Sequence, residues 1–295
     1  MTGGAGFIGS HLVDALVDRG DEVVVFDDLS RGDEKNISGK AKFSSGDVRK
    51  IGDWQKACLD FRPDVIHHLA AVNGTKRFHD EADLVIDVNV NGLINAIKIS
   101  KQYNSKLVFY SSPEAFGETN AMPLSNASNS FFTPANLHQR HSYGSSKYIG
   151  ELLCNYEIRH GMDITIVRPF NVYGSRLRGD ENGQVVSMML NSNPIIVHGD
   201  GTQTRSFTWV GDVIEALLKI NDSSKVSGMC FNLGSNEETK IIDLARMISK
   251  LTETEIEFGE QNHGDSLRRL PDLTLNEKIS WKANTTLEEG LNQLL

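Results

Sequence analysis

The first nine residues constrain the fold more than any other stretch of this sequence. Residues 4–9 read Gly-Ala-Gly-Phe-Ile-Gly and match the pattern G-x-G-x-x-G, and residues 10–17 continue with the apolar spacing of a helix. Glycines let the backbone turn tightly, approach a pyrophosphate and pack a helix closely on a strand. The free N–H groups at the start of that helix would face the phosphates. The pattern therefore predicts a turn that binds a dinucleotide.

An acidic residue supports this interpretation. Residues 22–26, Glu-Val-Val-Val-Phe, indicate a buried parallel strand, and Asp27 ends it. A carboxylate at this distance from the glycine turn receives the ribose hydroxyls of NAD and would repel the 2′-phosphate of NADP. We therefore expect NAD, and Arg31 is the one nearby residue that could soften the preference. The cofactor contacts predicted by this part of the chain are Gly3, Gly6, Phe7, Ile8, Gly9 and Asp27.

The start of the chain does not match the motif. A strand of five or six apolar residues should precede the glycine turn, yet Met1 stands where that strand should be ending. The first strand normally lies in the middle of a doubly wound sheet, so its loss would leave neighbouring backbone groups unpaired. We therefore expect that the chain lacks its natural N-terminus or starts at a misplaced residue.

Apolar strand patterns alternate with helical patterns through the first half of the chain. This alternation predicts an α/β fold, a doubly wound parallel sheet of the Rossmann type with helices on both faces. The expected domains are residues 1–173 for the NAD-binding part and residues 174–295 for a smaller C-terminal lobe, with part of 206–235 returning to the first domain. The further strands and helices expected in the first domain are residues 41–48, 65–71, 84–103, 106–110, 143–160 and 164–167.

Ligands on such a sheet bind at the carboxyl ends of the strands, which extends the predicted cofactor site. Asp47 ends one apolar run and could face the adenine, and small alanines follow another where a nicotinamide ribose would come closest to the backbone. His67 and His68 are adjacent in a strand and point to opposite faces, so we expect no metal there. The additional cofactor contacts are Asp47, Val48, Leu69, Ala70, Ala71 and Asn89.

Composition excludes several classes of partner. The formal net charge of −9 argues against nucleic acid or an anionic membrane as a partner. Cys58, Cys154 and Cys230 lack metal-ligand spacing and are too isolated for a disulfide framework, which fits a reducing cytoplasm. No stretch approaches the roughly 20 apolar residues of a membrane span. No signal peptide is visible, although a missing N-terminus would hide one.

One group of residues carries the chemistry. Tyr143 and Lys147 are four residues apart, so on a helix they share a face and can reach one ligand. The lysine ammonium and a positive nicotinamide would both stabilise the phenolate, which makes Tyr143 a candidate base near neutral pH. Ser112, delivered from a strand end, can hydrogen-bond the same substrate oxygen.

With these residues in place, the chain resembles the extended short-chain dehydrogenase/reductase family, the nucleotide-sugar epimerases and dehydratases. The resemblance covers nearly the whole chain and includes both the glycine turn and the Tyr143–Lys147 pair. Its further motifs are residues 68–71 (His-Leu-Ala-Ala), 89–92 (Asn-Val-Asn-Gly), 168–174 (Arg-Pro-Phe-Asn-Val-Tyr-Gly), 199–207 (Gly-Asp-Gly-Thr-Gln-Thr-Arg-Ser-Phe) and 269–272 (Arg-Leu-Pro-Asp).

The resemblance implies a tightly held NAD that takes hydride from sugar C4 while Tyr143 takes the hydroxyl proton. The resulting 4-keto sugar is then processed, and the hydride is usually returned. The resemblance also implies a homodimer that pairs through helices 85–103 and 143–160. The residues that it assigns to binding the nucleotide-sugar substrate are Asn171, Val186, Arg205 and Arg269.

The residues after Ser112 leave the reaction open. In the family's 4,6-dehydratases an Asp-Glu pair stands here, whereas this chain has Pro113 and Glu114, and proline cannot protonate a leaving oxygen. C4 epimerases usually lack the acid. UDP-glucuronate decarboxylases carry a Glu here and resemble the chain at residues 182–187, but with Ser or Thr before that Glu.

We favour C4 epimerisation, with UDP-glucuronate decarboxylation as the main alternative. A 4,6-dehydratase, a keto-sugar reductase, a net oxidoreductase that exchanges free NADH and a non-catalytic NAD-binding protein stay open. A non-catalytic relative would keep Asp27 but lose the Tyr143–Lys147 pair, which this chain retains. The sugar pocket is expected to come largely from the irregular stretch 116–141.

Overall fold

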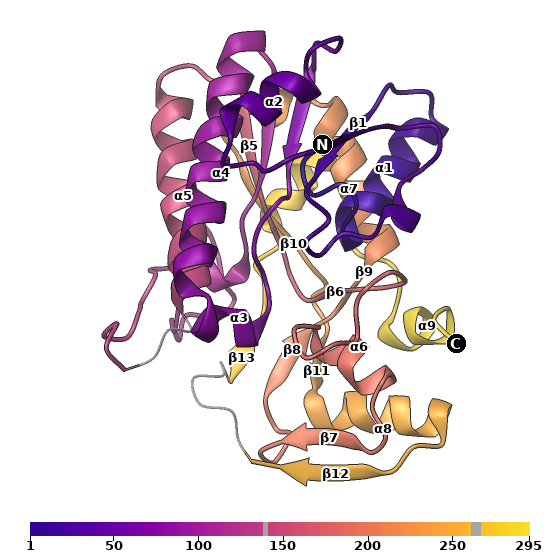
Figure 1. The fold of residues 1–295 in the computed structure, drawn as a ribbon. Helices are drawn as coiled ribbons and strands as arrows, with labels where there is room; N and C mark the ends of the chain where they lie inside the picture. Colours follow the sequence, from indigo (N-terminus) through magenta and orange to yellow (C-terminus); the bar gives the residue numbers. More distant parts are fainter. Residues whose placement is uncertain (138–140, 261–266) are drawn as a thin grey trace.

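The computed structural model describes residues 1–137, 141–260 and 267–295. Figure 1 shows a larger lobe, a parallel sheet with helices on both faces, above a smaller one. The helices are α1 (Phe7–Asp18), α2 (Ile51–Ala57), α3 (Thr75–Asp80), α4 (Ala82–Tyr103), α5 (His141–Arg159), α6 (Val185–Leu190), α7 (Val210–Asp222), α8 (Ile241–Thr252) and α9 (Leu287–Asn292).

The strands are short. The larger lobe contains β1 (Val24–Asp27), β2 (Lys42–Ser45), β3 (Val65–His68), β4 (Lys106–Tyr110), β5 (Ile164–Pro169) and β10 (Cys230–Leu233). The remaining strands are β6 (Val172–Tyr173), β7 (Ile195–His198), β8 (Thr204–Ser206), β9 (Thr208–Trp209), β11 (Glu238–Lys240), β12 (Ile256–Gly259) and β13 (Arg268–Arg269).

The larger lobe is built on parallel strand pairs. β1 pairs with β2, and β3, β4, β5 and β10 pair in that order. Thr2 lies between the two groups, because its N–H donates to His67 O and the next N–H, of Gly3, donates to Phe26 O, each at 3.0 Å. The strands on either side of the glycine turn are therefore β1 and β3. This arrangement confirms the predicted α/β fold with a doubly wound parallel sheet.

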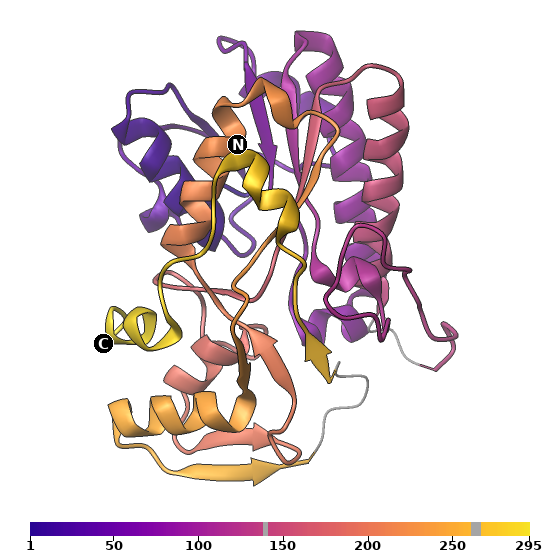
Figure 2. The same ribbon diagram turned by 180° about the vertical axis from the view of Figure 1, so that it is seen from behind.

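Helices cover both faces of this sheet. Figures 1 and 2 show α2, α4 and α5 on one face and α1 and α7 on the other. Each face has its own apolar core, one including Leu12, Val25 and Leu217 and the other including Leu93 and Phe109. β1 and β4 are buried throughout, as expected for strands covered on both sides.

The smaller lobe contains two further small sheets. β7 pairs with β12, and β8 lies between β11 and β13. Its core includes Val186, Val197 and Leu244, from α6, β7 and α8. Between the two lobes the chain crosses more than once, since α7 packs on α1 and β10 pairs with β5. Within the described residues, no helix combines the length and apolar character that a membrane crossing needs.

Candidate active site

The glycine turn has the shape that a pyrophosphate needs. Gly3 has a positive φ of 67°, and a Cβ there would lie 2.7 Å from Ala70 N. A Cβ on Gly9 would lie 2.2 Å from Gly3 O, so helix α1 can approach the turn only without that side chain. Gly6 precedes the first residue of α1, and no side chain caps the helix. The cradle is thus shaped by the absence of side chains, and a dinucleotide fits it.

Asp27 stands beside this turn at the end of β1. Its Oδ2 accepts from Ala5 N at 3.0 Å and its Oδ1 accepts from Leu29 N at 2.9 Å, which fixes the carboxylate against the glycine turn. Burial raises the pKa of Asp27 from its usual value. Arg31, the residue that could accept a 2′-phosphate, forms an ion pair with Asp180 at 3.0 Å.

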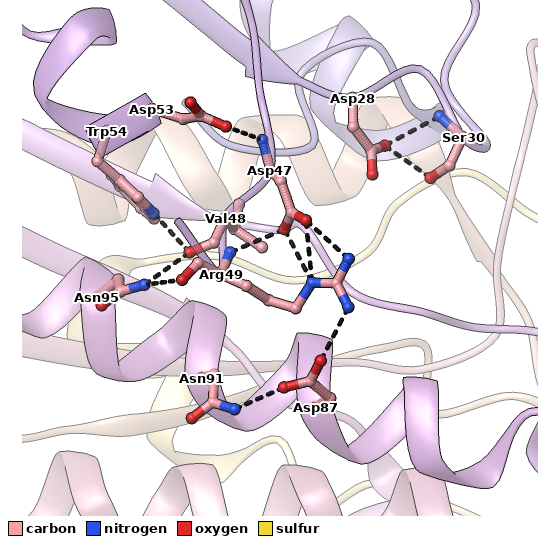
Figure 3. A network of polar contacts seen from close by, with 10 residues as sticks. All are labelled: Asp28, Ser30, Asp47, Val48, Arg49, Asp53, Trp54, Asp87, Asn91 and Asn95. Atoms are coloured by element: carbon pink, nitrogen blue, oxygen red, sulfur yellow. Dashed lines mark hydrogen bonds and ion pairs between the residues drawn. The ribbon is translucent and has the colours of Figure 1, made fainter. Parts of the chain in front are cut away.

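Asp47 and Val48 form the next turn along the edge of the sheet (Figure 3). Gly46 N donates to Asp27 O at 3.1 Å, which places this turn beside Asp27. Arg49 Nη2 lies 2.7 Å from Asp47 Oδ2, and this hydrogen bond lowers the pKa of the Asp47 carboxyl. The Asp47 carboxylate is thus held in place by Arg49 and favoured as an anion.

Asn89 on α4 is hydrogen-bonded to the loop that follows β3. Asn89 Oδ1 accepts from Val72 N at 2.8 Å, and its Nδ2 donates to Ser146 Oγ at 2.9 Å. Leu69 N and Ala70 N both donate to Thr2, at 3.2 Å to its carbonyl and hydroxyl oxygens respectively. The predicted strand 65–71 therefore ends at His68, and residues 69–72 continue as a loop between the glycine turn and α4.

Ser112, Tyr143 and Lys147 meet at the end of β4. Ser112 caps a short 3₁₀ helix, η2 (Pro113–Phe116), by accepting from Glu114 N at 3.2 Å. Its hydroxyl lies near that of Tyr143, where it partly offsets the rise in the Tyr143 pKa that burial causes. Lys147 Nζ donates to Tyr110 O at 2.7 Å, so the last residue of β4 orients the ammonium. The structure therefore brings together the serine, tyrosine and lysine that the sequence singled out.

The pKa values show how much of the expected activation of Tyr143 comes from the protein itself. Burial raises the pKa of Tyr143 well above its usual value and lowers that of Lys147 to about 8. Lys147 lies 5.6 Å from the centre of the Tyr143 ring and points to the Tyr110 carbonyl. The sequence prediction assigned the stabilisation of the Tyr143 phenolate to Lys147 and a positive nicotinamide together, and the lysine alone does not provide it. Further positive charge beside the phenol is needed.

A buried ion pair behind these residues was not predicted. Arg168 donates to both carboxylate oxygens of Glu151, at 2.7 and 2.6 Å, and Ser111 Oγ donates to the same carboxylate at 2.5 Å. The pair joins α5, β5 and the end of β4, directly beside Ser112. The spacing of Glu151, four residues after Lys147, was the available signal, because it places both side chains on one helix face.

Two arginines of the smaller lobe lie side by side. Arg269 on β13 is the register partner of Arg205 on β8, in parallel strands. Arg269 is 3% exposed; its Nη2 donates to Gly117 O at 2.6 Å and lies 3.5 Å from Glu114 Oε2. Its Nε and Nη1 are buried with no hydrogen-bond partner within the described part of the chain. Buried guanidinium donors left in this state point to an anionic ligand.

The other predicted substrate contacts are more distant from the chemistry. Asn171 has a positive φ of 37° and donates to Ser206 O at 3.1 Å, so it joins the two lobes behind the arginines. Val186 is 2% exposed and belongs to the core of the smaller lobe, where α6 begins. The predicted loop 116–141 includes residues 138–140, which lie outside the described residues.

No cluster that could hold a metal ion occurs in residues 1–137, 141–260 or 267–295. The two adjacent histidines are structural. His68 Nδ1 contacts Thr2 Oγ1 at 2.9 Å, and His67 Nδ1 contacts the Tyr110 hydroxyl at 3.0 Å. Burial lowers the pKa of His67 to about 4 and that of His68 to about 3, so both are neutral hydrogen-bonding groups near pH 7.

A glycine turn followed by an acidic strand end, combined with Ser112, Tyr143 and Lys147, defines a dinucleotide-dependent enzyme. Residues 1–234 match the NAD dependent epimerase/dehydratase family, and the chain belongs to that family. It is an enzyme, and its cofactor is NAD.

Known proteins resemble the whole chain. A UDP-N-acetyl-alpha-D-glucosaminuronate decarboxylase of Bacillus cytotoxicus is 32% identical, over 100% of this chain and 95% of the relative. The structure of a UDP-glucose 4-epimerase of Thermotoga maritima with UDP-glucose is 28% identical, with a TM-score of 0.92 over 99% of this chain and 96% of that chain. A UDP-glucose 4-epimerase of Thermus thermophilus with NAD has a TM-score of 0.88 and 27% identity, over 99% and 96% of the respective chains.

Proposed function

We propose that the protein is an NAD-dependent C4 epimerase of a nucleotide hexose, most simply a UDP-hexose. The observation that carries this proposal is the juxtaposition of Ser112 and Tyr143 at the end of β4, with Lys147 anchored beside them by the Tyr110 carbonyl. Inversion at C4 needs one base and one hydroxyl partner at the C4 oxygen, and this pair supplies both. The neighbours with UDP-glucose and NAD support the ligands.

Three residues of the chain have separate roles in this reaction. Tyr143 takes the proton of the C4 hydroxyl, and Ser112 hydrogen-bonds the same oxygen. Bound NAD supplies the redox chemistry and the positive charge that favours the Tyr143 phenolate. Lys147 adds a second positive charge, held in place by the Tyr110 carbonyl. Inversion at C4 would require the 4-keto sugar to rotate in the site, so that hydride returns to its opposite face while Tyr143 returns the proton to the C4 oxygen.

We assign the ligand contacts as follows. The cradle of Gly3, Gly6 and Gly9 with the start of α1 holds the pyrophosphate of NAD, and Asp27 receives the adenosine ribose. Asp47 and Val48 lie at the adenine end. Arg269 binds the diphosphate of the sugar nucleotide with Nε and Nη1, which have no hydrogen-bond partner among the described residues.

A specific contact favours decarboxylation of a UDP-uronate as a second candidate. Glu114 lies 3.5 Å from Arg269 and is partly exposed, so a carboxylate and a guanidinium stand together beside Ser112. Such a pair could orient a substrate that carries a carboxylate at C5. The Bacillus cytotoxicus relative, named as a uronate decarboxylase, points the same way. Pro113 has no hydroxyl to assist, which counts against this candidate.

Product analysis separates the two candidates. The purified protein is incubated separately with UDP-glucose, UDP-N-acetylglucosamine and UDP-glucuronate, and the products are followed by mass spectrometry and proton NMR. Unchanged mass with an inverted C4 proton coupling supports epimerisation. Loss of carbon dioxide from UDP-glucuronate supports decarboxylation instead, and loss of water contradicts both candidates.

We also propose a homodimer that pairs through α4 and α5. These helices lie side by side on one face of the sheet (Figure 2), and their outer surface carries large apolar side chains. The exposed ones are Ile86, Tyr148, Ile149, Leu152 and Tyr156. Burying such a patch against a second copy is favourable. Sedimentation velocity at micromolar concentration should give a dimer, and Leu152→Glu should give a monomer; a monomeric wild type contradicts the proposal.

A further inference from the structure

Residues 175–182, which we name the strap, connect β6 to α6 and contact the larger lobe at both ends. At the first end, His11 Nε2 lies 3.0 Å from Ser175 O, and Arg176 pairs with Asp14 at 2.7 Å. His11 and Asp14 belong to α1, the helix that begins at the glycine turn. The strap therefore starts on the helix whose N-terminus forms the pyrophosphate cradle.

The other end of the strap contacts the loops on both sides of the glycine turn. Arg31 Nη1 lies 3.2 and 3.0 Å from the two carboxylate oxygens of Asp180, and its Nη2 donates to Asn182 O at 3.4 Å. On the opposite side, a Cβ at Gly74 would lie 2.8 Å from Asn182 Cβ and Oδ1. Arg31 follows β1 and Gly74 follows β3, the two strands that flank Thr2. The strap thus spans from one flank of the cofactor site to the other.

We propose that the strap is a latch over NAD and that the Arg31–Asp180 ion pair closes it. A dinucleotide with its ribose at Asp27 and its pyrophosphate at the glycine turn would lie between the two loops that the strap contacts. Its release would then require the strap to separate from Arg31. The inference rests on the cofactor site and not on which sugar is converted, and it explains how NAD stays bound while it is reduced and reoxidised.

The latch also affects cofactor selectivity. Arg31 lies four residues after Asp27, where an arginine can accept the 2′-phosphate of NADP. In the structure both of its terminal nitrogens are directed to the strap. Asp180 therefore holds the guanidinium away from the one place where it would help NADP. Removing the Asp180 charge should free Arg31, whereas removing Arg31 itself cannot have that effect.

The test measures NADH release from the full chain in the absence of sugar. Protein loaded with NADH is mixed with excess NAD, and the loss of bound-NADH fluorescence gives the dissociation rate. Asp180→Asn and Arg31→Gln should each speed release about two- to fivefold, as expected for a partly exposed ion pair. The double variant should be no faster than either single variant, because both remove the same interaction. Asp18→Asn, which breaks the exposed pair with Lys40 on the far side of α1, is the matched control.

A second measurement distinguishes a latch from a general weakening of cofactor binding. Binding of NADP and NAD is titrated for each variant; Asp180→Asn should lower the ratio of the NADP to the NAD dissociation constant, and Arg31→Gln should not. Unchanged release rates, fully additive effects in the double variant, or equal loss of both cofactors overturn the proposal. Because no sugar is present, failure of the epimerase proposal would leave these results untouched.

Discussion

The two ends of the active site differ in whether their polar side chains already have hydrogen-bond partners within the protein. At the cofactor end, Asp27 accepts two backbone N–H groups and Lys147 donates to the Tyr110 carbonyl. At the substrate end, Arg269 is buried with two nitrogens that lack a partner among the described residues. The side chains at the cofactor end therefore already have partners within the protein, whereas the buried donors of Arg269 await a ligand.

This difference matches two kinds of ligand. A site that is rigid before binding loses little entropy on binding and suits a cofactor retained through many turnovers. A buried guanidinium without partners lowers the stability of the folded protein, and an anion that binds to it gains strong hydrogen bonds. This arrangement suits a substrate that binds and leaves. The contrast predicts that variants at the cofactor end mainly lose rate and that variants at the substrate end mainly lose affinity.

The largest effect is expected at Tyr143. Tyr143→Phe removes the base and keeps the ring, which stacks on Phe78 at 4.8 Å, so folding should be preserved. General-base removal costs on the order of 10²–10⁴ in rate, and the dissociation constant of the nucleotide sugar should stay nearly constant. Steady-state kinetics and calorimetry measure the two quantities. Tyr103→Phe, at the far end of α4, is the control, and near-normal turnover by Tyr143→Phe would require a different base.

Arg269 should show the opposite pattern. Arg269→Met removes two buried donors that lack a partner among the described residues, but it also removes the hydrogen bond from Nη2 to Gly117 O. The two effects oppose each other, so the free energy of unfolding should change little, while affinity for UDP should drop about 10- to 100-fold. Arg268→Met is a matched control, because Arg268 is the exposed neighbour that pairs with Glu238. Urea denaturation and UDP titration give both values. If Arg269→Met and Arg268→Met bound UDP with equal affinity, the assignment of the diphosphate to Arg269 would be wrong.

Lys147 links catalysis to stability through pH. Burial lowers its pKa from 10.5 to about 8, so at pH 7 the folded protein bears the cost of a buried ammonium. Lys147→Met should therefore be inactive but more stable at pH 7, by on the order of 1–3 kcal/mol. Between pH 8 and 10.5 the folded wild type releases this proton and the unfolded chain keeps it. Wild-type stability should then rise relative to the variant.

Denaturation curves at pH 7 and pH 10 check this sign. The difference in unfolding free energy between Lys147→Met and wild type should shrink at the higher pH. Lys98→Met, at an exposed position on α4, should give a small difference that does not change with pH. A gap that widens at pH 10 would show that Lys147 is stabilised as a cation in the folded protein.

The first lobe could be predicted because its signals are local. The glycine turn, the buried strand before Asp27 and the Tyr143–Lys147 spacing each lie within a few residues, and helix and strand periodicity connects them. The second lobe gives no such periodicity, and only the family resemblance marks residues 199–207 and 269–272 there. β8 is three residues long and pairs with β11 and β13, which lie far along the chain, so its pattern is too short to recognise.

The contacts between distant segments could not be predicted for the same reason. Arg31 and Asp180 are separated by 149 residues, and Arg269 and Glu114 by 155. Nothing in either local sequence specifies the partner, because charged residues are common on any surface. The raised pKa of Tyr143 also depends on burial by several segments, and the spacing of Tyr143 and Lys147 carries no information about it.

The smallest effect is expected at Glu114, where the two ends of the site meet. If the enzyme only inverts C4, no proton moves through this carboxylate, and Glu114→Gln keeps the shape and the contact with Arg269. Turnover of a UDP-hexose should then stay within about threefold of wild type. If the enzyme decarboxylates a UDP-uronate, the same variant should lose turnover by orders of magnitude. Assays of both substrates with one preparation compare these outcomes directly, and a large loss would assign Glu114 to the chemistry at C5.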